Sequence, residues 1–142
     1  MGRILGVDVG TRTLGLALSD EGGTVAMPLS VIRRSGLRRD IADLARLVRE
    51  REVTEIVVGL PLGLDGAPGA MAEEARVVAD RLAEATGLPV HRWDERLSTV
   101  AAERALLEAD LSRRKRKRVV DKVAAALILQ AFLDRRALGR AP

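Results

Sequence analysis

A chain of 142 residues that is 47% apolar and 31% charged has the size and composition of a folded domain rather than a disordered segment. It has no cysteine and one histidine, which excludes disulfides, cysteine nucleophiles and metal sites built from thiolates or several histidines. Its net charge of +4 favours acidic partners, but two large aromatic residues, Trp93 and Phe132, are too few for single-strand binding by base stacking. Without a leader-like start or an apolar stretch of about 18 residues, a cytoplasmic protein is expected.

The first part of the chain predicts three strands in close succession. Residues 3–9 are apolar on both faces, as in a central strand that is covered on each side. Further strands are predicted over 13–19 and 24–33, and Pro28 indicates that the third is an edge strand or contains a bulge. Such short connections predict an antiparallel meander.

Beyond residue 36 the apolar pattern changes to the helical period and alternates with short strands. Helices are predicted over 37–51, 70–85, 99–109 and 119–137, and strands over 55–60 and 88–92. Strands alternating with helices predict a parallel continuation of the sheet. The predicted fold class is therefore α/β, a mixed sheet flanked by helices, within a single domain over residues 1–142.

Asp8 stands near the end of the first predicted strand, where a charged carboxylate is costly unless it is paired or binds a cation. Hydrogen bonds from the turn at 10–12, or an ion pair with Arg12, are the alternatives. Asp94 and Glu95 follow another strand-like run. Because side chains alternate along an extended chain, one of these two acids can face Asp8, and the pattern leaves open which one.

Asp121 is the third candidate acid. It shares a helical face with Ala124, Ala125 and Ile128, and small alanines let a helix approach a sheet closely. A carboxylate early in a helix is also favoured by the helix dipole alone. Three carboxylates brought together would repel each other, and a divalent metal is the simplest remedy. The pattern predicts a metal-dependent enzyme that acts on phosphate.

Basic residues and a glycine-rich loop are the candidate substrate contacts. Six basic residues in a row precede the last predicted helix: Arg113, Arg114, Lys115, Arg116, Lys117 and Arg118. Such a run is often a solvated loop, but its closeness to Asp121 favours a contact with a polyanion. The loop that begins at Gly59 either lines the substrate groove or is an ordinary connection. His91 and Trp93 are interpreted as structural.

Four motifs in order resemble the YqgF/RuvX family of RNase H-like nucleases and cover nearly the whole chain. They are Asp8-Val9-Gly10-Thr11-Arg12, Gly59-Leu60-Pro61 with Asp65-Gly66, Asp94-Glu95-Arg96-Leu97-Ser98-Thr99, and Asp121-Lys122-Val123-Ala124-Ala125. The resemblance implies an RNase H-like fold with a five-stranded mixed sheet whose first three strands are antiparallel. It also implies that the catalytic, metal-holding acids are Asp8, Glu95 and Asp121.

The function implied by the resemblance is hydrolysis of phosphodiester bonds in the 5′-end maturation of pre-16S rRNA, a step of ribosome biogenesis. The residue types suit two Mg²⁺ or Mn²⁺ ions about 4 Å apart, with Asp8 bridging. Arg12, Arg96 and the basic run would hold phosphates of structured RNA. A monomer or weak homodimer without membrane contact is expected. The alternatives are a Holliday-junction-resolvase-like DNA endonuclease, a non-catalytic rRNA-binding assembly factor and an actin-like phosphotransferase.

Overall fold

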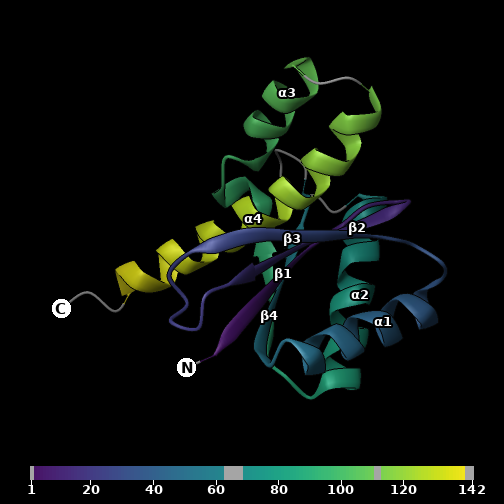
Figure 1. Ribbon diagram of the computed structural model, residues 1–142, viewed down its shortest axis with the longest axis vertical. Coiled ribbons are helices and arrows are strands. Elements are labelled where there is room, and N and C mark those ends of the chain that lie inside the picture. The colour runs from purple at the N-terminus through teal and green to yellow at the C-terminus, as the bar shows by residue number, and fades with distance from the viewer. Residues whose placement is uncertain (1, 63–68, 111–112, 140–142) are drawn as a thin grey trace.

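One mixed sheet forms the centre of the computed structural model, which describes residues 2–62, 69–110 and 113–139 (Figure 1). Within these residues the sheet has five strands in the order β3-β2-β1-β4-β5. Their bounds are β1 (Arg3–Val9), β2 (Thr13–Ser19), β3 (Ala26–Arg33), β4 (Val53–Leu60) and β5 (Val90–Asp94). The first three strands are antiparallel, and β4 and β5 continue parallel to β1. The predicted meander and its parallel continuation are both confirmed.

Pro28 lies on the edge strand β3, opposite Ala17, where the register between β2 and β3 shifts. An edge strand has one side without a neighbour, and a bulge relaxes the ladder, so a residue without an N–H is tolerated there. Both predictions drawn from Pro28, the edge strand and the bulge, are therefore confirmed.

Helices cover both faces of the sheet. They are α1 (Leu37–Glu50), α2 (Ala70–Thr86), α3 (Val100–Asp110) and α4 (Arg113–Gly139), with a short 3-10 turn, η1 (Glu95–Leu97), after β5. Figure 1 shows α1 and α2 on one side and the long α4 crossing the other, while α3 and the start of α4 project beyond the sheet. None of the described helices is long and apolar enough to cross a membrane.

The prediction that the basic run precedes the last helix is wrong, because α4 already begins at Arg113. Arginine and lysine are good helix formers, and no glycine or proline interrupts the run, so the helix extends through it. Smaller differences concern three strands: β3 begins at Ala26 rather than at residue 24, β4 begins at Val53 rather than at residue 55, and β5 covers 90–94 rather than 88–92.

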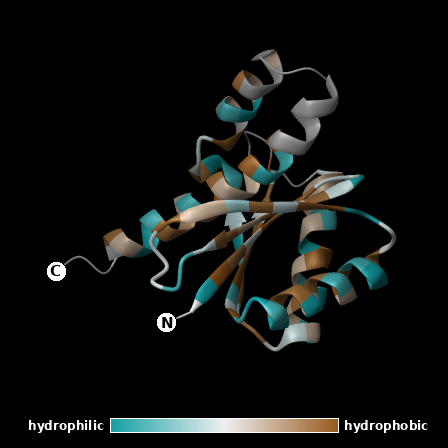
Figure 2. Ribbon diagram, viewed as in Figure 1, coloured by the Kyte–Doolittle hydropathy of each residue, from teal (hydrophilic) through white to brown (hydrophobic). Residues whose placement is uncertain are grey.

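Two apolar clusters lie on opposite faces of the sheet. Leu5 and Val7 point toward α1 and α2, whereas Ile4 packs with Ile128 and Leu129 of α4. Both faces of the central strands are therefore covered, which explains why their sequence is apolar without alternation. In Figure 2 the hydrophobic colour accordingly runs along the central strands and on the helix sides that meet them.

Glycines on three neighbouring strands allow α4 to lie directly on the sheet. A Cβ at Gly6 would lie 2.9 Å from the Leu129 Cβ, and one at Gly59 would lie 2.6 Å from the Ile128 Cδ1. At Gly15 the added atom would meet the backbone of α4 itself. Side chains at these positions would force the helix outward. The missing side chains thus bring the carboxylate-bearing part of α4 close to β1 and β2.

Candidate active site

Two of the predicted acids, Asp8 and Glu95, lie at the end of the sheet where β1, β4 and β5 finish. Asp8 is the next-to-last residue of β1, and Glu95 follows β5 directly, as the first residue of η1. Both are buried, with 7% and 9% of their surface exposed. Gly15 pairs with Asp8 across the ladder, and a Cβ at Gly59 would lie 3.4 Å from the Glu95 side chain, so glycines leave room for both acids.

Arg104 of α3 joins these two acids. Its Nη2 lies 3.2 Å and 3.4 Å from the two carboxylate oxygens of Asp8 and 3.8 Å from Glu95 Oε1. The partner of Asp8 is therefore Arg104 and not Arg12, which was one of the alternatives. The sequence carried a weak signal for this contact, because Arg104 lies one helical turn after the buried Val100 and shares its face.

The two acids are electrostatically strained. Burial raises the pKa of Asp8, the neighbouring charge of Asp121 raises it further, and the Arg104 guanidinium opposes this effect. Burial, with a contribution from the charge of Asp8, raises the pKa of Glu95 to about 7, although Arg104 again acts in the opposite direction. A single guanidinium thus compensates the two buried carboxylates incompletely.

Asp121 stands beside this pair rather than in contact with Arg104. The Thr13 hydroxyl on β2 donates a hydrogen bond of 2.5 Å to Asp121 Oδ2. Among the described residues, no group of three or more His, Cys, Asp or Glu side chains is arranged to hold a metal ion. Asp8 and Glu95 therefore meet at one positive charge, the guanidinium of Arg104. Asp121 lies close enough for its charge to act on Asp8.

The choice between Asp94 and Glu95 is decided by η1. The Asp94 side chain accepts hydrogen bonds from the Arg96 backbone N–H at 2.9 Å and from the Arg96 guanidinium at 2.7 Å and 3.0 Å. These bonds hold the pKa of Asp94 below its ordinary value. Asp94 thus caps the 3-10 turn, and Glu95 is the acid that faces Asp8.

A second arginine that the sequence reasoning missed, Arg34, fixes the turn after Asp8. Its Nη1 donates to the Gly10 carbonyl at 3.1 Å, its Nε to Asp40 at 3.0 Å and its Nη2 to Glu74 at 2.7 Å. Its backbone N–H also donates to the Arg12 carbonyl at 2.8 Å. Asp40 is fully buried, so this network ties the turn to α1 and α2. No local pattern marks Arg34, because its partners come from distant segments.

The candidate phosphate-binding residues differ in their exposure and in their partners. Arg12 is exposed on the turn between β1 and β2. Arg96 is paired with Asp94. The basic run 113–118 forms the start of α4, on the same helix as Asp121, but its side chains lie outside the described residues, as do residues 63–68 of the candidate loop.

His91 and Trp93 make packing contacts, which agrees with their interpretation as structural residues. His91 Nε2 lies 2.7 Å from Glu55, which also pairs with Arg136 of α4. The His91 ring lies 4.8 Å from Phe132, and Trp93 meets Phe132 edge to face at 5.9 Å. These contacts fasten the carboxyl-terminal half of α4 to β4 and β5.

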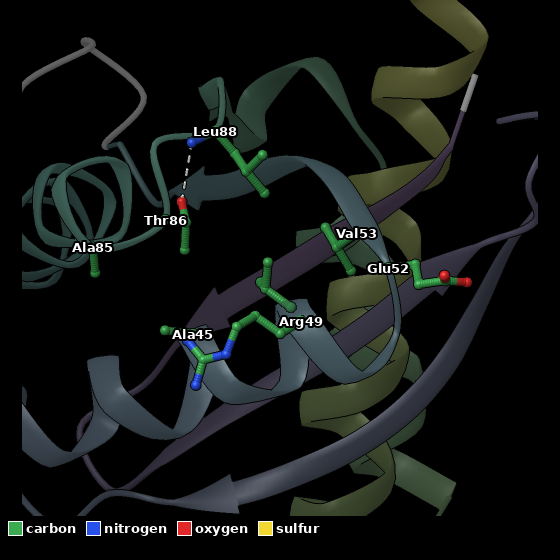
Figure 3. Close-up of a pocket in the computed structure, with 8 residues that line it drawn as sticks. Ala45, Arg49, Glu52, Val53, Ala85, Thr86 and Leu88 are labelled. Atoms are coloured by element: carbon green, nitrogen blue, oxygen red, sulfur yellow. Dashed lines mark hydrogen bonds between the residues drawn. The ribbon is translucent and has the colours of Figure 1, made fainter.

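A hollow of about 280 Å³ lies at the opposite end of the sheet (Figure 3). It is bounded by the carboxyl-terminal ends of α1 and α2 and by the first residue of β4, and the residues labelled there are Ala45, Arg49, Glu52, Val53, Ala85, Thr86 and Leu88. Because β4 runs parallel to β1, the start of β4 is remote from Asp8 near the end of β1. This hollow does not belong to the acid site.

Two solved resolvase structures share this fold. The *T. thermophilus* RuvC in complex with a Holliday junction substrate superposes with a TM-score of 0.62 at 17% identity, covering 99% of this chain and 98% of that one. The Fowlpox virus resolvase bound to Holliday junction DNA has a TM-score of 0.53 at 8% identity, covering 94% and 98%. At such identities the likeness establishes the fold, which is the RNase H-like resolvase fold.

Sequence comparisons are more specific. The family model described as RuvX, Holliday junction resolvase, matches residues 2–135. Proteins of *Moorella thermoacetica* and *Myxococcus xanthus*, each named "Putative pre-16S rRNA nuclease", are 56% and 52% identical to this chain. The alignments cover 94% and 93% of this chain and 95% and 87% of the relatives. The chain belongs to the RuvX family.

Proposed function

We propose that this protein is a metal-dependent nuclease that hydrolyses phosphodiester bonds of structured RNA in the 5′-end maturation of pre-16S rRNA. The observation that carries the proposal is the buried pair of Asp8 and Glu95, which converges on one positive charge. The names of relatives that align over nearly their whole length support the RNA substrate. Residues 1–142 would act as a single nuclease domain, and such a role would place the protein in the cytoplasm.

The residues present fit a divalent cation. Carboxylate oxygens are the ligands that Mg²⁺ and Mn²⁺ prefer, and Asp8 and Glu95 already hold a cation, the guanidinium of Arg104. Asp8, Glu95 and Asp121 would hold the metal. One or two such ions, when bound, would lower the pKa of the attacking water and neutralise charge on the leaving oxygen.

The chain's own residues would prepare the site for that chemistry. With a pKa of about 7, the Glu95 carboxyl is partly protonated near neutral pH. It would release this proton when a metal cation binds, because the cation then supplies the positive charge beside the carboxylate. The turn fixed by Arg34 holds the backbone after Asp8 in place. Arg12 and the basic run would contact phosphates on either side of the scissile bond, which adds affinity without sequence selectivity.

The direct test is cleavage of a pre-16S leader RNA by the purified chain. We expect cutting with Mg²⁺ or Mn²⁺ and none with EDTA. Asp8→Asn and Glu95→Gln should abolish cutting while circular dichroism shows a folded protein. Glu84→Gln, on the exposed side of α2, is the matched control and should cut normally. Cleavage that persists in EDTA or in Asp8→Asn would disprove the proposal.

Branched DNA is the alternative substrate, and the fold shared with two junction-bound resolvases favours it. A four-way junction and the leader RNA should be compared with the same protein in the same salt. Faster cutting of the junction would replace RNA maturation by junction resolution. RNA binding without cleavage of either substrate under any metal would instead support a non-catalytic assembly factor.

A further inference from the structure

Arg104 comes from α3, whose main contacts are with α4 and η1 rather than with the sheet. In Figure 1, α3 and the start of α4 project beyond the strands, and α3 packs chiefly on α4 and η1. The Arg104 side chain reaches back from this projection to Asp8 and Glu95. It therefore links the projecting helix to the two buried acids of the sheet.

The contacts of Arg104 are those of a counter-charge rather than of a well-formed hydrogen-bonding pair. One nitrogen, Nη2, serves both carboxylates, and its distances of 3.2 to 3.8 Å are long for a charge-assisted hydrogen bond. The Nε atom is buried and has no hydrogen-bond partner among the described residues. An arginine fork that matched a carboxylate would use two nitrogens in parallel. Arg104 is thus held by charge, with little geometric fit.

We propose that Arg104 is an internal counter-ion that occupies the cation position between Asp8 and Glu95 in the metal-free protein and competes with divalent ions for these two acids. This inference rests on the proposed function, since it concerns the same acids. A guanidinium brings one positive charge, and a divalent ion brings two at a shorter distance from oxygen. A dication held by the same oxygens would repel the guanidinium, so metal binding displaces Arg104 and releases α3 from the acids.

The opposite role for Arg104 predicts the opposite result. If Arg104 mainly assembled the acids for the metal, its removal would let Asp8 and Glu95 separate and would weaken metal binding. If Arg104 competes, its removal strengthens metal binding. In both cases the metal-free protein loses stability, because two buried carboxylates lose their counter-charge. Metal affinity is therefore the measurement that separates the two roles.

The experiment is a calorimetric titration of the whole chain with Mn²⁺ alone, without nucleic acid. We expect Arg104→Met and Arg104→Gln to bind Mn²⁺ about tenfold more tightly than the wild type, since each removes the competing charge. Arg81→Met, an exposed arginine of α2, is the matched control and should bind as the wild type does. Melting curves should show a lower melting temperature without Mn²⁺ and a larger rise with it in both Arg104 variants.

The outcomes separate this inference from the proposed function. Unchanged or weaker Mn²⁺ binding in a folded Arg104 variant, with normal binding by the wild type, overturns the competition alone. Lack of Mn²⁺ binding by every form, the wild type included, overturns the metal-dependent function as well. Arg104→Gln keeps a polar side chain that can donate hydrogen bonds but carries no charge, so it decides the matter if the methionine variant does not fold.

Discussion

The Thr13 hydroxyl donates a 2.5 Å hydrogen bond to the Asp121 carboxylate and so connects β2 with α4 across 108 residues of sequence. A hydrogen bond to a charged acceptor is stronger than one between neutral groups. It holds the third acid at a place where its charge still acts on Asp8. Thr13 is therefore part of the site even though it is neither acidic nor basic.

Replacing Thr13 tests this connection. We expect Thr13→Val to lower the free energy of unfolding by about 1.5–3 kcal/mol, because a partly buried carboxylate loses its donor. Thr13→Ser keeps the hydroxyl and should stay near the wild type. Urea unfolding at pH 8 measures the difference. Equal stability of the valine and serine variants would show that the hydrogen bond contributes little.

Gly15 tests the close packing of α4 on the sheet. An added Cβ would lie 2.0 Å from the Asp121 carbonyl oxygen, a backbone atom that cannot rotate away. Gly15→Ala should therefore destabilise the protein by roughly 3 kcal/mol or more and reduce cleavage, because α4 must shift and carry Asp121 with it. Gly139→Ala is the control, since nothing lies within 4 Å of its added Cβ. Similar melting temperatures of the two variants would contradict this account.

The raised pKa of Glu95 predicts a pH-dependent stability. In the folded protein its pKa is about 7 against an ordinary 4.5, so the folded state binds the proton more tightly than the unfolded state. The corresponding stabilisation is complete below about pH 4.5 and is lost as the pH rises through about 7. This loss amounts to roughly 3 kcal/mol at most. The free energy of unfolding of the metal-free wild type should therefore fall between about pH 5 and pH 8 relative to that of Glu95→Gln. Urea unfolding at each pH measures it.

Bound metal should oppose this loss of stability at high pH. Because the ligand form of Glu95 is the deprotonated one, Mg²⁺ should raise the melting temperature of the wild type more at pH 8 than at pH 6. Glu95→Gln should show a smaller rise at both values. A parallel pH profile of wild type and Glu95→Gln without metal would contradict the assignment of the raised pKa to Glu95.

The basic run at the start of α4 should contribute affinity and salt dependence. We expect the double variant Arg116→Ala/Lys117→Ala to bind leader RNA more weakly, with a slope of log affinity against log salt that is shallower by about 1 to 2. The double variant Arg46→Ala/Arg81→Ala removes two exposed charges from α1 and α2 and is the control. Fluorescence anisotropy at several salt concentrations measures both. Equal slopes for the two variants would exclude the run as a phosphate contact.

Local patterns predicted the type and order of the elements because hydrophobic period, glycine and proline act over a few residues. The apolar run 3–9, the edge position of Pro28 and the helical stripe of α1 all have such local causes. The start of α4 was mispredicted because a run of charges was interpreted as a loop, although arginine and lysine favour helix.

The sequence by itself determined that this chain has an α/β fold and three acids on separate elements, and it identified the family. Tertiary structure decided that Glu95 rather than Asp94 faces Asp8, that Arg104 and Thr13 contact the acids, and that Arg34 fixes the neighbouring turn. These contacts join residues up to 108 positions apart. Their geometry depends on how α3 and α4 pack on the sheet, because most of these contacts join side chains from segments that are far apart in the sequence.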